Sequence, residues 1–181
     1  MNKLIFFSKN LNKIYEVKNI LEKRKFKILT LNDLPKIRGP KEVGDTFEKN
    51  ATIKSCFGFE KFGLPCFADD SGICISALDN KPGIYSKRFQ KENGGIKKTL
   101  QKIINETKRK KNFNAFFQTT ISFTIKKNIT ICFKGTVKGK ISAQPLGSFG
   151  FHYDPIFIPR GQTKTYAQMF SNEKNLLSHR A

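Results

Sequence analysis

Two adjacent carboxylates, Asp69 and Asp70, end a short apolar run in the segment CFADDSG, residues 66–72. Glu42 is a third acid that the fold can bring near them. Magnesium binds a few carboxylates together with waters and substrate phosphates, so these acids are candidate metal ligands. Adjacent strand residues point to opposite faces. We therefore expect the strand to break at the following Ser-Gly pair if both aspartates serve one site; the alternative is a polar turn.

The segment SKNLNK, residues 8–13, lies between an apolar run and a helical pattern. Backbone N–H groups at a helix N-terminus are unsatisfied and can bind a phosphate. Asn10 can cap the helix, Ser8 can donate a hydrogen bond, and Lys13 stands one turn into the helix. The segment lacks the GxxxxGK[ST] pattern of a P-loop, so the alternative is a plain N-cap followed by a solvated lysine.

Two segments near the C-terminus combine aromatic and basic residues. GFHYDP, residues 150–155, offers aromatic surfaces on which a base can stack, although Phe151 and Tyr153 can equally belong to the core. EKNLLSHR, residues 173–180, crowds basic and polar side chains together: Lys174, Ser178, His179 and Arg180. The alternative interpretation of this second segment is a basic helix end that the helix dipole favours.

Hydrophobic periodicity predicts the elements that position these segments. LIFF, residues 4–7, and FKILTL, residues 26–31, are typical of short strands, with an amphipathic helix between them. Asp45, three residues before Glu48, resembles a capping box that opens a helix running to about residue 62. A strand, helix and strand in succession indicate an α/β sheet.

The clearest periodicity lies in residues 113–125, where apolar and polar side chains alternate. A period of two over this length predicts a long half-buried strand. Residues 126–128 turn the chain, and apolar residues from 129 to 137 run back as an antiparallel partner. A helix is expected near 94–108. The chain should therefore form a mixed sheet flanked by helices.

The composition is strongly basic, with 34 Lys and Arg against 14 Asp and Glu in 181 residues and a formal net charge of +20. Such a surplus attracts polyanions such as nucleic acid. The alternative is compositional drift of the coding sequence, because 28 of the 34 cations are Lys. The length fits one domain, or one domain with a lobe.

The four cysteines form no CxxC pair, so neither a zinc site nor a disulfide framework is indicated. The apolar run in the first nine residues is too short for a signal peptide or a spanning helix. We expect a cytoplasmic protein with reduced thiols and no membrane association.

The order of several motifs along the chain resembles the Ham1 family of inosine/xanthosine triphosphate pyrophosphatases. The motifs are SxNxxK at 8–13, TFxxNAxxK at 46–54, ADDSG at 68–72, PGIYSKRF at 82–89, GFxYDPIF at 150–157, and TxAxM followed by EKNxxSHR at 165–180. The resemblance extends over nearly the whole chain with consistent spacing.

This resemblance implies an elongated mixed α/β fold with two lobes around a central substrate cleft, formed by residues 1–181 as one domain and assembled as a homodimer. It further implies magnesium-dependent hydrolysis of the 6-oxo purine nucleotides ITP, dITP and XTP to the monophosphate and pyrophosphate, a reaction that cleanses the nucleotide pool.

The resemblance also implies roles for individual residues. The triphosphate would be bound by Ser8, Lys9, Asn10, Leu11, Asn12, Lys13 and Lys54. The metal would be held by Glu42, Asp69 and Asp70. Asp70 would accept a proton, and Ser71 would contact substrate. The base pocket would be lined by Phe151, His152, Tyr153 and Asp154 and completed by Lys174, His179 and Arg180.

Three residues depart from the usual family pattern: Lys49, His152 and Gln168 replace Glu, Gly and Glu. The chain stops at Ala181, where relatives continue into a further helix, so we expect the domain to lack that helix. A catalytically impaired, basic nucleic-acid-binding protein that retains the fold is the alternative function, with binding to nucleic acid as a nonspecific consequence of charge.

Overall fold

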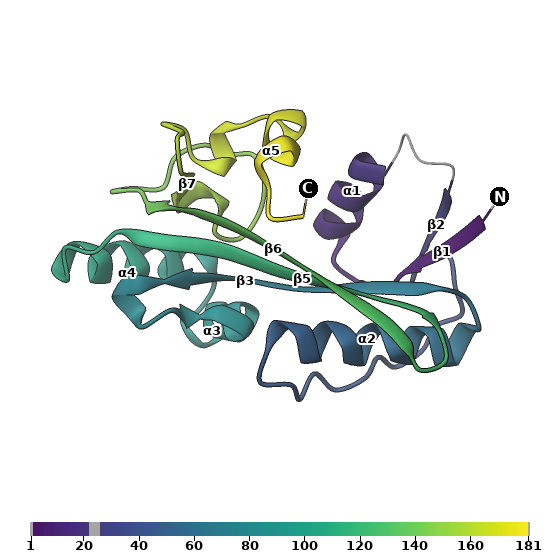
Figure 1. The fold of residues 1–181 in the computed structure, drawn as a ribbon. Helices are drawn as coiled ribbons and strands as arrows, with labels where there is room; N and C mark the ends of the chain where they lie inside the picture. The colour runs from purple at the N-terminus through teal and green to yellow at the C-terminus, as the bar shows by residue number, and fades with distance from the viewer. Residues whose placement is uncertain (1, 22–25, 181) are drawn as a thin grey trace. The chain divides into compact units, whose positions relative to one another are not determined.

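The computed structural model describes residues 2–21 and 26–180, and its strands form a mixed sheet (Figure 1). The described strands are β1 (Asn2–Phe6), β2 (Phe26–Thr30), β3 (Cys66–Ile75), β4 (Lys81–Pro82), β5 (Asn114–Lys126), β6 (Ile129–Ile141) and β7 (Phe157–Pro159). They are hydrogen-bonded in the order β2-β1-β3-β5-β6-β7, and β4 pairs with β3. The pairs of β1 with β2 and β3 are parallel, whereas β3–β4 and β6–β7 are antiparallel.

The principal described helices are α1 (Leu11–Leu21), α2 (Phe47–Phe62), α3 (Ser86–Glu92), α4 (Ile96–Arg109) and α5 (Ser171–Leu177). They confirm the sequence-based expectation of a mixed sheet flanked by helices, and α3 is an addition that the sequence pattern did not predict. Contacts divide the chain into a first unit, Met1–Asp70 with Thr119–Lys134, and a second unit, Ser71–Gln118 with Gly135–Ala181. Strands β3, β5 and β6 contribute residues to both units.

In the first unit, α1 and α2 cover opposite faces of the strands (Figure 1). Phe6 and Phe67 pack with Ile14 of α1, and their rings stack with centroids 4.9 Å apart. Phe7 and Ala68 belong to the other cluster, which Phe57 of α2 joins. Because successive strand residues alternate between faces, neighbouring residues of β3 serve different helices.

The face of β5 toward α2 is polar and buried. In this part of the strand Thr120, Ser122 and Thr124 are at most 3% exposed. The Ser55 hydroxyl of α2 lies 2.8 Å from Ser122 Oγ and accepts a hydrogen bond from Thr124 at 2.9 Å. The apolar Ile121 is less buried. The predicted alternation is therefore present, but here hydroxyl groups that satisfy one another occupy the better buried face.

Thr46 caps the N-terminus of α2. Its side chain accepts a hydrogen bond from the Lys49 amide at 3.1 Å. The predicted cap at Asp45 is wrong, because that carboxylate instead forms an exposed ion pair with Lys49 Nζ at 2.8 Å. Gly63 ends the helix in the left-handed region, with φ of 65° and its amide bonded to the Phe59 carbonyl.

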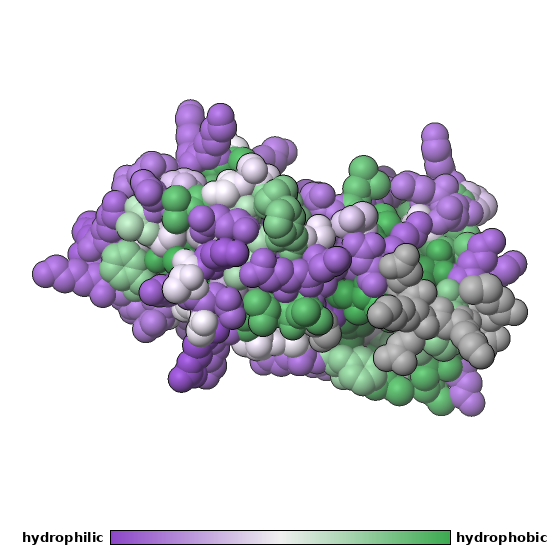
Figure 2. Space-filling model, turned by 90° about the horizontal axis from the view of Figure 1, so that it is seen from above, coloured by the Kyte–Doolittle hydropathy of each residue, from purple (hydrophilic) through white to green (hydrophobic). Residues whose placement is uncertain are grey.

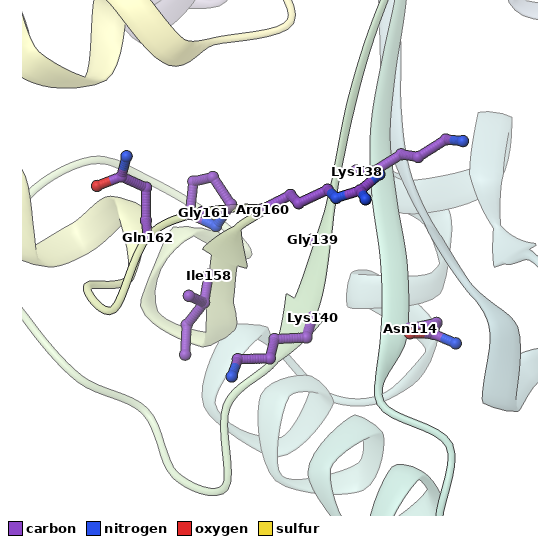
Figure 3. Close-up of a pocket in the computed structure, with 9 residues that line it drawn as sticks. Asn114, Lys138, Gly139, Lys140, Ile158, Arg160, Gly161 and Gln162 are labelled. Carbon is purple, nitrogen blue, oxygen red and sulfur yellow. The ribbon is translucent and has the colours of Figure 1, made fainter.

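The second unit has its own core, in which α4 packs against β3 and β5. Ile103 and Ile104 of α4 lie in one cluster with Ile73 and Phe117. Phe157 of β7 joins it, with its ring centroid 4.8 Å from that of Phe117. The β6–β7 pair also borders a cavity that opens beside the strands (Figure 3).

Hydrophilic residues cover much of the face shown in Figure 2, in keeping with the large excess of Lys and Arg. Within the two described ranges, none of the helices combines the length and the apolar character that crossing a membrane requires.

Candidate active site

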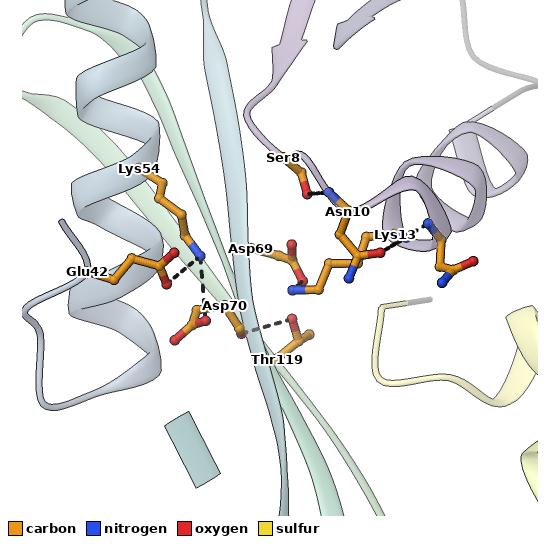
Figure 4. A network of polar contacts seen from close by, with 9 residues as sticks. Ser8, Asn10, Lys13, Glu42, Lys54, Asp69, Asp70 and Thr119 are labelled. Carbon is orange, nitrogen blue, oxygen red and sulfur yellow. Dashed lines mark hydrogen bonds and ion pairs between the residues drawn. The ribbon is translucent and has the colours of Figure 1, made fainter. Parts of the chain in front are cut away.

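Asp69 and Asp70 lie on opposite faces of β3 and have different partners (Figure 4). Asp69 Oδ2 is 2.8 Å from Lys13 Nζ of α1. Asp70 Oδ1 is 3.5 Å from Lys54 Nζ of α2. The predicted strand break after this pair is wrong, because β3 continues without interruption to Ile75. The two carboxylates therefore act on the two faces of the sheet.

Gly72 allows close packing of the chain around β3. A Cβ atom at this position would lie 2.1 Å from the Gly83 carbonyl oxygen and 2.6 Å from Ser86 Oγ. Ser86 in turn accepts a hydrogen bond from the Ile73 amide at 3.1 Å and donates one to Gly83 at 2.6 Å. The glycine in this motif is therefore required by a neighbouring backbone segment and not by a turn.

Asp70 has a buried carboxyl group whose pKa is shifted by its surroundings. It is 8% exposed, and its Oδ2 atom has no hydrogen-bond partner among the described residues. Burial raises the pKa of its carboxyl above the ordinary 3.8, although the ammonium groups of Lys54 and Lys13 oppose the shift. Thr119 donates a hydrogen bond to the Asp70 backbone carbonyl at 3.3 Å, which holds the strand at this point.

Lys54 joins Asp70 to the loop that precedes α2. Its Nζ atom lies 3.3 Å from Glu42 Oε2, so one ammonium group is shared by two carboxylates (Figure 4). The buried Asn50 accepts a hydrogen bond from the Gly44 amide at 2.8 Å and fixes this loop on α2. Asn50 and Lys54 are four residues apart on α2 and therefore share a helix face, and both contact the same loop.

The N-terminus of α1 is capped as predicted. Asn10 Oδ1 accepts hydrogen bonds from the amides of Asn12 and Lys13 at 3.1 and 3.3 Å. Ser8 Oγ accepts one from the Asn10 amide at 3.2 Å. The remaining residues of the predicted phosphate segment, Lys9 and Leu11, are exposed. The segment thus presents a structured helix start beside the Lys13–Asp69 pair (Figure 4).

The acids of the first unit fit a divalent cation only in part. Asp70 offers a buried carboxylate oxygen without a hydrogen-bond partner among the described residues, which suits a hard cation. Glu42 is on the same side, since both carboxylates contact Lys54. Asp69 lies on the other face. Across residues 2–21 and 26–180 no three His, Cys, Asp or Glu side chains are gathered closely enough to form a metal site.

A second group of predicted residues gathers in the second unit around Asp154. Its Oδ2 atom accepts hydrogen bonds from the Phe151 amide at 2.7 Å and from Lys174 Nζ at 2.6 Å. Both charged side chains are at most 6% exposed. Lys174 Nζ also lies 4.6 Å from the centroid of the Phe151 ring and 5.5 Å from that of Tyr166. Asp154 therefore anchors the aromatic loop and the lysine together.

Tyr153 and His152 attach the same loop to α3. The Tyr153 hydroxyl donates to the Ser86 carbonyl at 2.6 Å, and burial raises the pKa of this phenol, which keeps it a donor. His152 adopts a positive φ of 53°, and its Nδ1 lies 2.8 Å from Gln90 Oε1. The side chain that replaces the usual glycine therefore contacts α3.

His179 and Arg180 are both buried, at 6% and 7% exposure. The His179 ring stacks on Phe117 with centroids 4.9 Å apart and planes inclined by 6°. Lys174 lies on α5 in this second unit. Ser71, the first residue of β3 that belongs to this unit, is half-buried. The structure thus places the predicted residues in two groups, one in each unit.

Sequence reasoning missed several residues that position these groups: Asn50 as a loop anchor, Ser86, Gln90 and Phe117. Ser86 lies in PGIYSKRF, one of the motifs on which the family resemblance rests, but the resemblance implied no role for this serine. No local signal distinguishes Gln90 or Phe117 from other surface or core residues, because their partners in this site, His152 and His179, each lie 62 residues away.

Comparisons with known proteins agree with this arrangement of motifs. A sequence profile described as the Ham1 family matches residues 4–181. The dITP/XTP pyrophosphatase of Halalkalibacterium halodurans is 41% identical over 182 residues, covering 99% of this chain and 94% of the relative. That of Porphyromonas gingivalis is 38% identical, covering 100% of this chain and 93% of the relative.

Solved structures show the same fold. A HAM1 protein from Coxiella burnetii aligns with a TM-score of 0.88 and 31% identity, over 99% of this chain and 93% of that one. The Staphylococcus aureus Ham1 protein aligns with a TM-score of 0.85 and 34% identity, over 99% and 92%. The resemblance in the ordered motifs is thereby confirmed, and this chain belongs to the Ham1 family.

Proposed function

We propose that this protein is a nucleoside triphosphate pyrophosphatase that removes noncanonical purine nucleotides, among them dITP, XTP and ITP, from the nucleotide pool. The names of its relatives support this substrate class. The observation that carries the chemistry is the buried carboxylate of Asp70, whose pKa is raised by burial and which lies beside Lys54. A base poised in this way is suited to activating water.

In the proposed reaction, Asp70 takes a proton from a water molecule. The resulting hydroxide attacks the α-phosphorus, and the bond from this phosphorus to the oxygen that bridges to the β-phosphate breaks. The bridging oxygen keeps the electron pair, so the products are the monophosphate and pyrophosphate. Lys54 and Lys13 supply positive charge for the phosphate oxygens in this scheme, and the N-terminus of α1 supplies amide donors.

We propose Mg²⁺ as the cofactor, with Asp70 and Glu42 as ligands on one face of β3. The unpartnered Oδ2 atom of Asp70 supports this assignment. When bound, the ion would neutralise phosphate charge and lower the pKa of a coordinated water. Asp69 was expected as a third ligand, and its position on the opposite face favours a role in holding Lys13.

We assign base recognition to the group in the second unit. Arg180 can donate hydrogen bonds but cannot accept them. A 6-oxo group is an acceptor, whereas the 6-amino group of adenine would leave donors facing donors, and unpaired buried polar groups are strongly selected against. Phe151, held by Asp154, offers a ring surface for stacking. Homodimerisation and a cytoplasmic location, which the family resemblance implies, remain predictions.

The test is a measurement of pyrophosphate release from ITP, XTP, dITP, GTP and ATP, with magnesium and with EDTA. We expect magnesium-dependent release from ITP, XTP and dITP that exceeds release from ATP by at least tenfold. A folded sample that releases no pyrophosphate from any of them contradicts the proposed function. Steep salt-dependent binding to nucleic acid in that inactive sample would instead favour the alternative function.

A further inference from the structure

The β6–β7 pair in the second unit places cations opposite one another. The register aligns Lys140 with Ile158 and Gly139 with Pro159. The Arg160 amide donates to the Lys138 carbonyl at 2.8 Å, which continues this register by one residue. Residues that oppose each other in an antiparallel pair share a face, and like charges in that position destabilise the pair. Lys138 and Arg160 are such a like-charged pair.

These cations lie on the sheet face that points away from the core. A Cβ atom on Gly139 would lie 2.7 Å from the Phe157 ring, so the glycine faces the core and its neighbours Lys138 and Lys140 face outward. Both lysines and Arg160 are exposed. None of the three forms an ion pair with any residue in the described ranges.

The three cations line a cavity of about 390 Å³ that carries no acidic residue (Figure 3). Asn114 and Gln162 add amide groups to its wall, and the side chain of Arg160 reaches across to β6 beside Lys138. The volume lies within the usual range for small-ligand pockets, ~300–1,000 Å³. Local charge conflicts of this kind are expected at functional or strained positions.

We propose that this cavity is a binding site for a small oligophosphate anion. Several adjacent cations without acidic partners match a multiply charged anion, and a guanidinium group beside an ammonium group is suited to phosphate oxygens. The cavity has the size of one small ligand, which favours an oligophosphate over a nucleic-acid strand. Its lining shares no residue with the predicted site residues, so the inference does not rest on the proposed hydrolysis.

Amide NMR with inorganic triphosphate in EDTA and 150 mM NaCl tests the proposal, because salt at this concentration screens isolated surface lysines. The reporters are the backbone amides of Gly139 and Gly161, which border the cavity. We expect saturable shifts of both signals. The variant Lys138→Ala/Arg160→Ala should bind at least tenfold more weakly while hydrolysing ITP at the unaltered rate.

The matched control is Lys97→Ala/Lys108→Ala, which removes two exposed cations from α4 in the same unit. It should bind triphosphate within twofold of the unaltered chain. The proposal is overturned if triphosphate moves neither glycine signal, as expected if the cations only protect an edge strand from pairing. It is equally overturned if both double variants weaken binding alike, or if only a single-stranded oligonucleotide shifts the signals. ITP hydrolysis, measured separately, reports on the proposed function alone.

Discussion

Two lysines, one in each unit, are held in different ways. Lys54 in the first unit is shared between Glu42 at 3.3 Å and Asp70 at 3.5 Å, and Glu42 is half exposed. Lys174 in the second unit is 2.6 Å from Asp154, and both side chains are almost fully buried. The first arrangement gives one ammonium group two carboxylate partners at longer distances. The second fixes an ammonium group against aromatic rings.

This difference matches the two tasks of the proposed reaction. Hydrolysis at a phosphate needs cationic side chains that can contact the phosphate oxygens, and a carboxylate whose raised pKa suits it to accept a proton. Recognition of a flat base needs a pocket whose shape is set before binding, since ordering side chains on binding costs free energy. We therefore expect substitutions in the first unit to impair turnover and substitutions around Asp154 to impair stability.

The largest effect is expected for Asp70→Asn. Loss of a general base lowers turnover by about 10²–10⁴-fold, and loss of a metal ligand adds to this. The melting temperature should stay close to that of the unaltered chain, because burial already disfavours the charged carboxylate. Pyrophosphate release from ITP and a thermal melt measure the two properties. Asp45→Asn, at an exposed acid, is the control; near-normal release by Asp70→Asn removes Asp70 from its assigned role.

The next largest effect is expected for Asp154→Asn, and it concerns the stability of the fold and not the turnover of substrate. This change leaves the buried Lys174 ammonium without its carboxylate partner, which costs about 3–5 kcal/mol of stability. Urea unfolding measures the loss. The double variant Asp154→Asn/Lys174→Met should recover part of it, because it also removes the buried ammonium group that had paired with Asp154. Equal unfolding midpoints for Asp154→Asn and Asp45→Asn would show that the buried pair is no more important than an exposed one.

A smaller effect is expected for Arg180→Ala. Removing the donor that we assign to the 6-oxo group should reduce the preference for ITP over ATP by about tenfold, in line with the loss of a hydrogen bond to a charged group. The comparison of kcat/KM for the two nucleotides measures this. Lys9→Ala, which alters an exposed residue of the other unit, should leave the ratio unchanged. An unchanged ratio in Arg180→Ala contradicts the assignment.

The smallest effect is expected for Tyr153→Phe. The change removes the 2.6 Å hydrogen bond to the Ser86 carbonyl and should cost about 1 kcal/mol in the free energy of unfolding. Tyr85→Phe is the matched control, since Tyr85 is 50% exposed. The urea midpoint distinguishes the two variants. Identical midpoints would mean that Tyr153 does not fasten the aromatic loop to α3.

Local sequence patterns predicted most helices and strands, and the ordered motifs predicted the family. Helical spacing after residue 10 and the alternation in residues 113–125 depend on neighbouring residues, and both appear as α1 and β5. The short helix α3 was missed, and the capping residue of α2 was assigned one position too early. The residue types of the candidate site, carboxylates with lysines and aromatics with cations, were also evident from the chain itself.

Tertiary structure decided which of these residues meet. Asp69 and Asp70 are adjacent in sequence yet face different helices, because β3 continues where a break was expected and alternates through both positions. Asp154 and Lys174 are 20 residues apart and form a buried ion pair at 2.6 Å. The sequence by itself determined most of the elements and the chemistry of their side chains, since these arise from neighbours along the chain. Partners and burial depend on contacts between distant segments, which local patterns do not encode.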